Sequence, residues 1–259
     1  MNFYRHLALL SLPLLLHLTA AQSAVAQNSI VPLLTPHPAL TPEQVVSKLV
    51  QSNLNRAQRL AAYRGTRTYR LEYQGFPGSR SAEMVVDVRY ESPATKKFTI
   101  RSETGSKLLI DRVFKRLLQG EKEALTDDNA RQVALNRDNY TFAQVGYEST
   151  PAGAFYVLSV QPRTKNKFLY QGRIWVDAQD FAVVRLEGKP AKNPSFWTKD
   201  TQIEQTYSKV GEFWFPLSNR SNTSIRLGGR AFLTIEYKDY QTTAVPPLKD
   251  SDSTVAGYR

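Results

Sequence analysis

The chain carries few side chains that could act as nucleophiles, general bases or metal ligands. It has no cysteine, and its three histidines, His6, His17 and His37, all precede residue 41. Without imidazole or thiol groups, the remaining sequence excludes thiol nucleophiles, Ser-His triads, histidine-bound zinc and most bases that titrate near neutral pH. The residues from Thr41 onward therefore favour binding over bond-breaking, and we expect no enzyme activity and no bound metal.

Two pairs of aspartates are the remaining candidates for catalysis or metal binding. Asp177 and Asp180 flank a short turn between predicted strands, where aspartate is favoured because its side chain accepts hydrogen bonds from the turn backbone. Asp127 and Asp128 are interpreted as a helix-start or loop signal rather than a metal pair. An enzyme built on Asp177 and Asp180 is an alternative, which loss of an activity in a folded double variant would support.

The first residues have the pattern of an export signal. Arg5 and His6 give a positive start, residues 7–18 form a nearly unbroken apolar run, and Ala24-Val25-Ala26 is the small-x-small pattern that signal peptidase recognises. The run is shorter than the roughly 20 residues that cross a hydrocarbon core. We therefore expect a signal peptide over residues 1–26, cleaved before Gln27, and a soluble protein outside the cytoplasm; an uncleaved anchor is the alternative.

Charge and length indicate one basic domain. The chain of 259 residues has a net charge of +11, and a domain of this size buries enough surface to need no disulfides. A basic protein outside the cytoplasm is attracted to anionic surfaces such as lipid head groups, envelope polymers or acidic proteins. We expect transient contact with an anionic membrane surface, and no nucleic acid because of the export signal. The alternative is that the basic residues only keep the protein soluble. We expect the domain over residues 41–244, after a proline-rich linker at 27–40 and before a loosely ordered tail at 245–259.

Two amphipathic helices are predicted. Thr41-Pro42-Glu43-Gln44 combines an N-cap threonine, proline at the first helical position and glutamine at the capping-box position, and apolar residues then recur at helical spacing to Ala61. A second helix begins at about Ser106 and carries an apolar stripe to Leu118, with lysine and arginine on its other face. We expect this stripe to pack on a sheet; lying on a membrane surface is the alternative.

Most of the remaining sequence alternates between polar and apolar residues. Segments 69–73 and 84–90 form a predicted hairpin around Gly75-Phe76-Pro77-Gly78, Phe98 and Ile100 suggest a third strand, and further strands follow between Tyr140 and Tyr240. Among these are separate strands at 213–219 and, with a break at Gly228-Gly229, at 221–240. A twisted sheet of about 11 strands curls rather than staying flat. The predicted fold is α+β and mostly antiparallel, a half-open curved sheet or incomplete barrel with helices covering the concave side.

Both faces of this sheet carry large apolar side chains. In the hairpin around the turn at 177–180, Ile174 and Val176 project to one face while Trp175, Ala182 and Val184 project to the other. One face could pack on the helices and the other could line a cavity. The candidate ligand-binding residues, each of which could instead be ordinary core packing, are Leu71, Val86, Ile100, Trp175, Trp197 and Trp214.

Several short blocks between Thr41 and Tyr240 resemble the bacterial outer-membrane lipoprotein-sorting protein family, the LolA/LolB-like superfamily. No single block is diagnostic, and none is catalytic. The blocks are Asn139-Tyr140-Thr141-Phe142, Gly172-Arg173-Ile174-Trp175-Val176-Asp177, Val184-Arg185-Leu186-Glu187-Gly188-Lys189-Pro190-Ala191, Pro194-Ser195-Phe196-Trp197, Gly211-Glu212-Phe213-Trp214-Phe215-Pro216, Gly229-Arg230-Ala231 and Ile235-Glu236-Tyr237.

This resemblance implies a periplasmic carrier without a cofactor or a reaction. Such a carrier shelters the acyl chains of a lipoprotein, or of another lipid, on the concave side of the sheet for delivery to the outer membrane, and its partners are inner- and outer-membrane sorting components. Homologues also act as lipid sensors or envelope-stress regulators, so a sensor or scaffold that does not transport is the alternative. The lid arginine of the family has no matching motif here, and its possible occupants are Arg56, Arg59, Arg64 and Arg67.

The free-energy cost of exposing acyl chains to water determines what kind of site a carrier needs. Exposure costs about 0.8 kcal/mol per methylene, so the cargo requires an apolar cavity that opens and closes. We expect the helices at residues 46–61 and 108–118 to be the movable cover of that cavity. An integral outer-membrane barrel is a further alternative, disfavoured by the two amphipathic helices and by charges on both strand faces.

Overall fold

The computed structural model describes residues 40–245 except 194, 197 and 227. The expected signal peptide, nearly all of the linker, the tail beyond residue 245 and Trp197 therefore lie outside the described residues, as do the side chains of Asp127 and Asp128.

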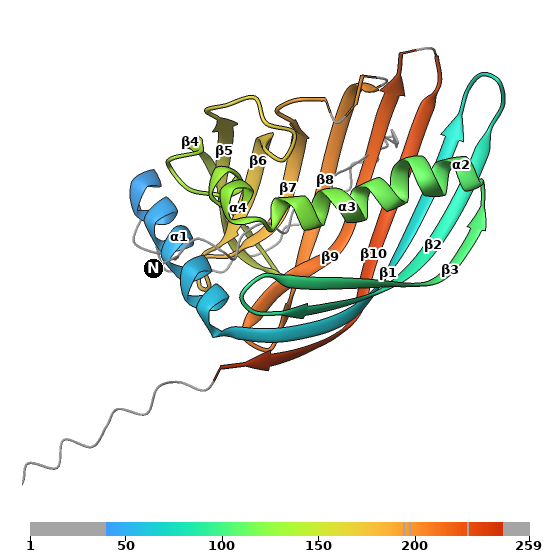
Figure 1. The fold of residues 1–259 in the computed structure, drawn as a ribbon. Helices are drawn as coiled ribbons and strands as arrows, with labels where there is room; N and C mark the ends of the chain where they lie inside the picture. The colour runs from blue at the N-terminus through green and yellow to red at the C-terminus, as the bar shows by residue number, and fades with distance from the viewer. Residues whose placement is uncertain (1–39, 194, 197, 227, 246–259) are drawn as a thin grey trace, which may run out of the picture.

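The fold is a wide antiparallel sheet with a few helices (Figure 1). The ten strands lie in the order β3-β2-β1-β10-β9-β8-β7-β6-β5-β4, so the first and last described strands, β1 and β10, pair with each other inside the sheet. The elements are α1 Pro42–Arg59, β1 Leu60–Gln74, β2 Arg80–Glu91, β3 Thr95–Gly105, α2 Lys107–Leu109, the π-helical turn η1 Ile110–Phe114, α3 Lys115–Ala124, α4 Asp127–Val133, β4 Tyr140–Thr150, β5 Gly153–Pro162, β6 Tyr170–Asp177, β7 Val183–Pro190, β8 Thr198–Val210, β9 Phe213–Ile225 and β10 Arg230–Ala244.

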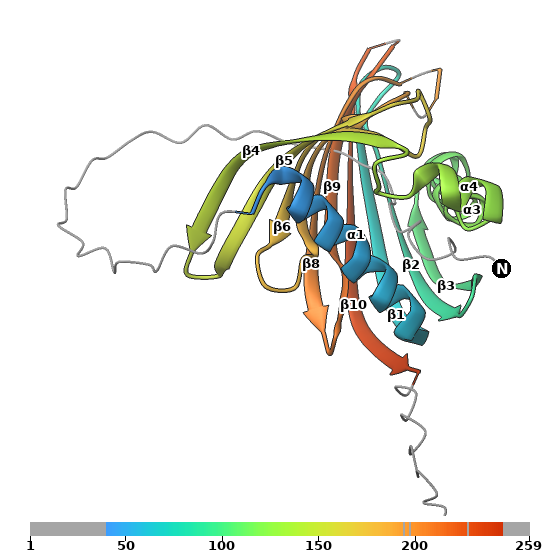
Figure 2. The same ribbon diagram turned by 90° about the vertical axis from the view of Figure 1, so that its left-hand side faces the viewer.

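The helices lie on the concave side of the curved sheet. In Figure 2 α1 crosses that side diagonally, and in Figure 1 α2, η1 and α3 run along it as one continuous helical segment. The sheet does not close on itself, because the edge strands β3 and β4 do not pair with each other. The predicted fold class is thus confirmed.

The sequence predicted about 11 strands, and the difference from ten arises in β9. We expected a strand boundary at the polar residues Asn219 to Ser221, but β9 runs from Phe213 to Ile225 without interruption. Asn219 and Ser221 are fully buried on the concave face, so their polarity does not mark a turn. It marks a polar region inside the sheet.

The start of α1 agrees with the sequence pattern. The backbone N–H of Gln44 donates to Thr41 Oγ1 over 3.3 Å, and the backbone N–H of Thr41 donates to Gln44 Oε1 over 2.8 Å, which completes the predicted capping box. The buried residues Val45, Val46 and Leu49 then form the face of α1 that packs on the sheet. The helix ends at Arg59, and β1 begins at the next residue.

The concave face carries two hydrophobic clusters. The first lies under α1 and α4 and takes its sheet residues from β4 to β8, while the second lies under η1 and α3 and takes them from β1, β2, β9 and β10. The second helical segment is longer than predicted because the helix continues past Leu118 to Ala124. Two helical covers therefore close one sheet from opposite ends.

Strands β6 and β7 approach each other closely where two glycines lie opposite one another. Gly172 pairs with Gly188, and a Cβ added to Gly188 would lie 2.3 Å from the backbone oxygen of Gln171. Backbone atoms cannot move aside as the end of a flexible side chain can, so a larger residue here must distort the sheet.

We expect Gly188→Ala to lower the free energy of unfolding by about 1 to 3 kcal/mol, measured by urea denaturation. Gly146→Ala is the matched control, because a Cβ on that strand glycine would meet only Val157, at 3.8 Å. Equal unfolding free energies for the two variants would contradict the close approach of β6 and β7.

Candidate functional site

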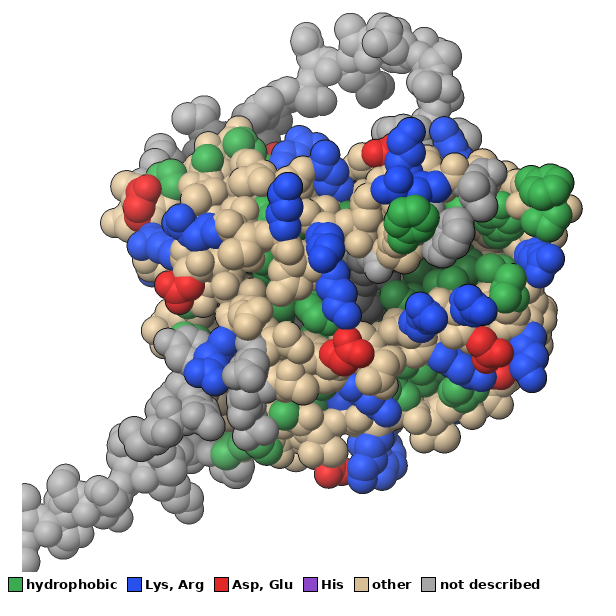
Figure 3. All heavy atoms as spheres, turned by 45° about the horizontal axis from the view of Figure 1, so that its top comes forward, with side chains coloured by type: hydrophobic (Ala, Val, Ile, Leu, Met, Phe, Trp, Pro, Cys, Tyr) green, Lys and Arg blue, Asp and Glu red, His purple; other side chains and the backbone are tan. Residues whose placement is uncertain are grey.

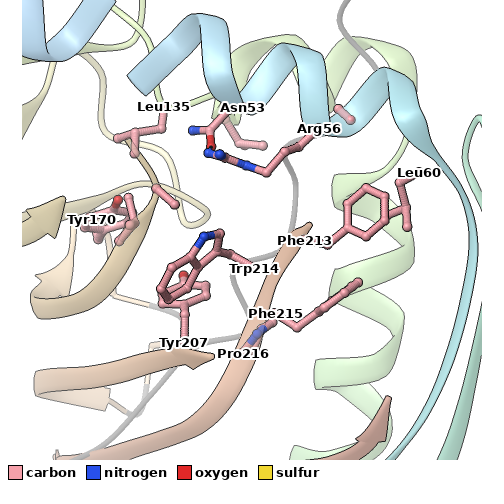
Figure 4. Close-up of a pocket in the computed structure, with 14 residues that line it drawn as sticks. Asn53, Arg56, Leu60, Leu135, Tyr170, Tyr207, Phe213, Trp214, Phe215 and Pro216 are labelled. Atoms are coloured by element: carbon pink, nitrogen blue, oxygen red, sulfur yellow. Dashed lines mark hydrogen bonds between the residues drawn. The ribbon is translucent and has the colours of Figure 1, made fainter. Parts of the chain in front are cut away.

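A cavity of about 130 Å³ lies between the last turns of α1 and the concave face of the sheet (Figure 4). Among the described residues of its lining, Asn53 carries an amide, Arg56 carries a charge, and the rest are aliphatic or aromatic. The lining residues are Asn53, Arg56, Ala57, Leu60, Val133, Leu135, Tyr170, Ala182, Val183, Tyr207, Phe213, Trp214, Phe215 and Pro216. Such walls suit an apolar ligand.

Helical and strand periodicity bring these residues together. Asn53, Arg56 and Ala57 have the spacing that places side chains on one face of a helix. Figure 4 shows Asn53 and Arg56 on the α1 side of the cavity and the rings of Trp214 and Phe213 facing them from β9. The face seen in Figure 3 is hollowed, with hydrophobic side chains inside and lysine and arginine side chains around the rim.

Arg56 ties α1 to the turn between β6 and β7. Its Nη1 donates to the backbone oxygen of Asp180 over 2.9 Å, and its Nη2 donates to the backbone oxygen of Phe181 over 3.0 Å and to Asn53 Oδ1 over 2.8 Å. Burial lowers the pKa of Arg56, and the carboxylates of Asp180 and Asp177 partly oppose that shift. The guanidinium group stays charged because an arginine pKa is far above neutral pH.

The aspartates of this turn have structural partners. Asp177 Oδ1 accepts hydrogen bonds from the backbone N–H groups of Gln179 and Asp180, at 3.0 and 2.6 Å, which confirms its interpretation as a turn residue. Asp180 Oδ2 accepts from Trp214 Nε1 at 2.8 Å and pairs with Lys209 Nζ at 2.6 Å. The hydrogen bond from Lys209 is the main reason why the pKa of Asp180 is lowered. Asp180 therefore fixes the indole of Trp214 at the cavity.

A buried ion cluster ties α3 to the sheet. Glu121 accepts two hydrogen bonds from Arg67 of β1, at 2.6 and 3.0 Å, and it also binds Lys96 of β3. All three side chains are at most 4% exposed. Aromatic rings surround the cations: Arg67 lies 5.0 Å from the ring centre of Tyr237, and Lys96 lies 5.4 Å from that of Tyr63.

Electrostatics keep this cluster ionised at neutral pH. Burial alone would raise the pKa of Glu121, but the charges of Arg67 and Lys96 and their hydrogen bonds lower it to about 2. Burial lowers the pKa of Lys96 to about 8, against the opposing effect of Glu121. Two cations share one carboxylate in a water-excluded space, and the removal of that carboxylate would leave like charges buried together.

The candidate ligand-binding residues occupy different places. Trp214 lines the cavity. Leu71 and Val86 are buried in the cluster under η1 and α3, away from the cavity lining, and Ile100 is 40% exposed. Trp175 lies on the opposite face of the sheet from its neighbour Ile174.

The surroundings of Trp175 show how this opposite face holds it. The Nε1 group of Trp175 donates to Glu148 Oε2 over 2.9 Å, and the guanidinium groups of Arg173 and Arg185 lie over its ring. Trp175 therefore belongs to a polar surface network and does not line the cavity.

Sequence reasoning missed several lining residues. Phe213 and Phe215 flank Trp214 in the block from Gly211 to Pro216 that resembles the LolA-like family. This aromatic run is the sequence feature that could have identified them as lining residues. Tyr170 and Tyr207 carried no such signal. Of the four arginines considered for the lid, only Arg56 lies in the cavity lining; Arg59 pairs with Glu212, Arg64 binds Gln241, and Arg67 belongs to the buried cluster.

The described part of the chain contains no group of three or more histidine, cysteine, aspartate or glutamate residues placed to hold a metal ion. Within the same residues, none of the helices combines the length and the apolar character that a membrane span requires.

The buried carboxylate predicts how stability depends on pH. A carboxyl group whose pKa falls from 4.5 to about 2 on folding stabilises the protein above pH 4.5, and that contribution, on the order of 3 kcal/mol, is lost as the pH falls through 2. We expect Glu121→Gln to lower the free energy of unfolding at pH 7 by about 3 to 5 kcal/mol and to flatten its decline between pH 5 and pH 2, measured by urea denaturation at each pH.

Glu83→Gln is the control for this prediction, because Glu83 pairs with Arg70 on the surface at 2.7 Å, where an ion pair contributes at most about 1 kcal/mol. A wild-type protein whose stability is constant between pH 5 and pH 2 would refute the assignment, even if Glu121→Gln does not fold.

Comparison with known proteins gives matches in structure only. No protein-family description and no curated protein sequence matches the chain. Among solved structures, a DUF1329 family protein from Desulfovibrio piger matches with 12% identity over 78% of this chain and 94% of that one, at a TM-score of 0.40. A putative outer membrane lipoprotein-sorting protein domain from Vibrio parahaemolyticus matches with 10% identity over 75% and 91%, at a TM-score of 0.37.

A LolA superfamily protein from Nitrosomonas europaea matches with 12% identity over 80% of this chain and 96% of that one, at a TM-score of 0.35. The three TM-scores are low, so these likenesses carry no argument about function. The matched structures nevertheless include the group that the sequence blocks resemble, the LolA-like proteins.

Proposed function

We propose that the protein is a periplasmic carrier that shelters the acyl chains of a lipoprotein, or of another lipid, and delivers them to the outer membrane. The observation that carries this proposal is the cavity beneath α1, whose lining is aliphatic and aromatic except for Asn53 and Arg56. Lysine and arginine side chains predominate over acidic ones on the face seen in Figure 3, which adds an attraction for anionic head groups.

The cavity is too small for a whole acyl chain. Sites for small molecules typically occupy about 300 to 1,000 Å³, whereas this cavity measures about 130 Å³. A dry apolar cavity of about 150 Å³ binds a molecule of the size of benzene. The closed protein therefore has room for the end of one acyl chain, and a whole chain enters only when the cover moves.

The tethers of the two helical covers suggest which one moves. Besides apolar packing, hydrogen bonds and one ion pair hold α1 at both ends. Near its start, Arg137 donates to the backbone oxygen of Glu43 in an exposed contact. Near its end, Arg56 makes part-buried hydrogen bonds, Val245 donates to the backbone oxygen of Arg59, and Arg59 pairs with Glu212 through side chains that are 50% and 33% exposed. The α3 segment is held by the buried carboxylate of Glu121 between two cations. Exposed ion pairs contribute little to stability, while breaking a buried pair is costly. We infer that α1 is the lid, that Arg56 is its latch, and that α3 stays fixed.

The α2–α3 segment presents its basic face to solvent. Lys107, Arg112, Lys115 and Arg116 are exposed, while Phe114 and Leu118 pack on the sheet. This face fits transient contact with an anionic membrane surface, from which cargo would be taken or to which it would be given. Inner- and outer-membrane sorting components are the protein partners that a carrier needs.

Transfer between membranes separates the carrier from a lipid sensor or scaffold. We expect the mature protein to take up a fluorescent acyl probe and to speed the probe's movement between anionic donor and acceptor vesicles. Ala57→Phe, which fills the cavity lining, should reduce probe affinity at least tenfold. Gln58→Phe adds the same ring to the exposed side of α1 and should leave affinity unchanged.

Different failures of this experiment have different meanings. Binding of the probe without any increase in transfer would favour the sensor or scaffold. The absence of probe binding would refute both the carrier and the lipid sensor. A normal affinity in a folded Ala57→Phe variant would place the binding site elsewhere on the protein.

Movement of the lid is measurable as a distance between spin labels. The chain has no cysteine, so Gln51→Cys on α1 and Gln179→Cys in the β6–β7 turn can be labelled cleanly. We expect the distance distribution to shift to longer values when an acyl probe binds, and to shift in the same direction without probe when Arg56→Met is added, because the latch to the turn is then lost.

The control pair Gln161→Cys with Arg220→Cys lies on β5 and β9 within the sheet and should give one unchanged distance. A label distance across the lid that stays constant with bound probe and with Arg56→Met would contradict a moving α1.

A further inference from the structure

Five polar side chains form a buried strip across the middle of the concave face. Each is at most 4% exposed, and the register of the strands pairs Thr201 with Thr223, Gln205 with Asn219, and Ile203 with Ser221. Because Ile203 belongs to the cluster under α1, these partners share the concave face with it. The polar strip consists of Thr201, Gln205, Asn219, Ser221 and Thr223.

Apolar residues border the polar strip on both sides. Leu186 of β7 pairs with Gln205 and belongs to the cluster under α1, while Leu233 of β10 pairs with Ser221 and belongs to the cluster under α3. Farther along the same two strands, the cavity-lining residues Tyr207 and Pro216 pair with each other. The polar strip therefore continues the floor of the cavity between the two hydrophobic clusters.

Two donors in the polar strip have no hydrogen-bond partner within the described part of the chain. Gln205 Oε1 accepts from Asn219 Nδ2 at 2.7 Å, and the hydroxyls of Thr201 and Thr223 lie 3.0 Å apart, but Gln205 Nε2 and Ser221 Oγ are unpaired. A buried donor without a partner destabilises a fold. The neighbouring strands place Leu186 and Leu233 in the equivalent positions, so stability alone does not account for polar residues here.

The helices cover β8 and β9, the central strands of the concave face, less closely than the strands on either side. The helices pack most closely on other strands, α1 on β1 and β4, and α2 and η1 on β2. A ligand that enters beneath α1 meets Phe213 and Phe215, which belong to the α3 cluster, and farther along β8 and β9 it would reach Gln205 and Ser221.

We propose that the polar strip binds the carbonyl oxygen of the ester or amide bond that joins an acyl chain to its polar head, through Gln205 Nε2 and Ser221 Oγ. This inference rests on the proposed carrier function and defines its ligand class. A neutral carbonyl group is an acceptor that matches neutral donors. A free carboxylate fits less well, because the cations of this side are already occupied. Arg67 and Lys96 bind Glu121, and the Arg56 guanidinium group donates to the backbone oxygens of the β6–β7 turn.

The test compares two probes that differ by one carbonyl group. A monoacylglycerol and the alkyl glycerol ether of the same chain length compete with a fluorescent acyl probe for the mature protein, which gives a dissociation constant for each. We expect the ester to bind about threefold to tenfold more tightly than the ether, the effect of one or two hydrogen bonds. Ser221→Ala and Gln205→Met should each reduce this ratio, and the double variant should bring it to about one while ether affinity is unchanged.

Two controls separate recognition from folding. Thr206→Val removes a hydroxyl that pairs with Ser218 at 2.9 Å on the opposite face of β8, and it should keep the wild-type ratio. Ser221→Ala removes an unpaired buried group, so its melting temperature should equal or exceed that of the wild type.

Each outcome has a distinct meaning. Equal affinities of the wild type for ester and ether, or an unchanged ratio in the folded double variant, would overturn the polar strip as a carbonyl site and leave the carrier proposal intact. If neither probe binds, the carrier proposal fails and this inference fails with it.

Discussion

The buried carboxylate of Glu121 is the interaction on which the enclosed side of the sheet depends. An open sheet of ten strands presents two faces to solvent, and its concave face carries two hydrophobic clusters that need a cover. Glu121 holds α3 over that face by binding Arg67 and Lys96, which belong to different strands. The carboxylate neutralises one of two cations that would otherwise repel each other, so the helix and the first three strands keep each other in place.

A fixed cover on one side allows a weaker cover on the other. The contacts of Arg56 with the β6–β7 turn are made to backbone oxygens, which any sequence at that turn would supply, and they are only partly shielded from water. These hydrogen bonds can break and re-form because water can replace the backbone oxygens as partners of the Arg56 guanidinium group. The charge is then not left without partners in an apolar environment. The difference between the two tethers is therefore a physical basis for a binding protein that must also release its ligand.

Much of the fold could be predicted from the sequence, because its signals are local. The capping box at Thr41 and the alternation of strand residues need only neighbouring positions. The site was harder to predict because it depends on distant contacts: the oxygens that hold Arg56 lie 124 and 125 residues away in the chain. Alternation separated Trp175 from Ile174 correctly, but it could not tell which face is concave. Asn219 and Ser221 suggested a strand boundary because polar residues are rarely buried in mid-strand without a reason.

The pairing of β1 with β10 has a consequence for the motion of α1. The backbone N–H of Val245, just beyond the last strand, donates to the backbone oxygen of Arg59, the final residue of α1, over 2.7 Å. The C-terminal end of α1, about which the helix would rotate, is thus hydrogen-bonded to the residue that follows β10. If the end of β10 separated from β1, this hydrogen bond would be lost and the end of α1 would be free to rotate. The movement of α1 therefore depends on the pairing of β10.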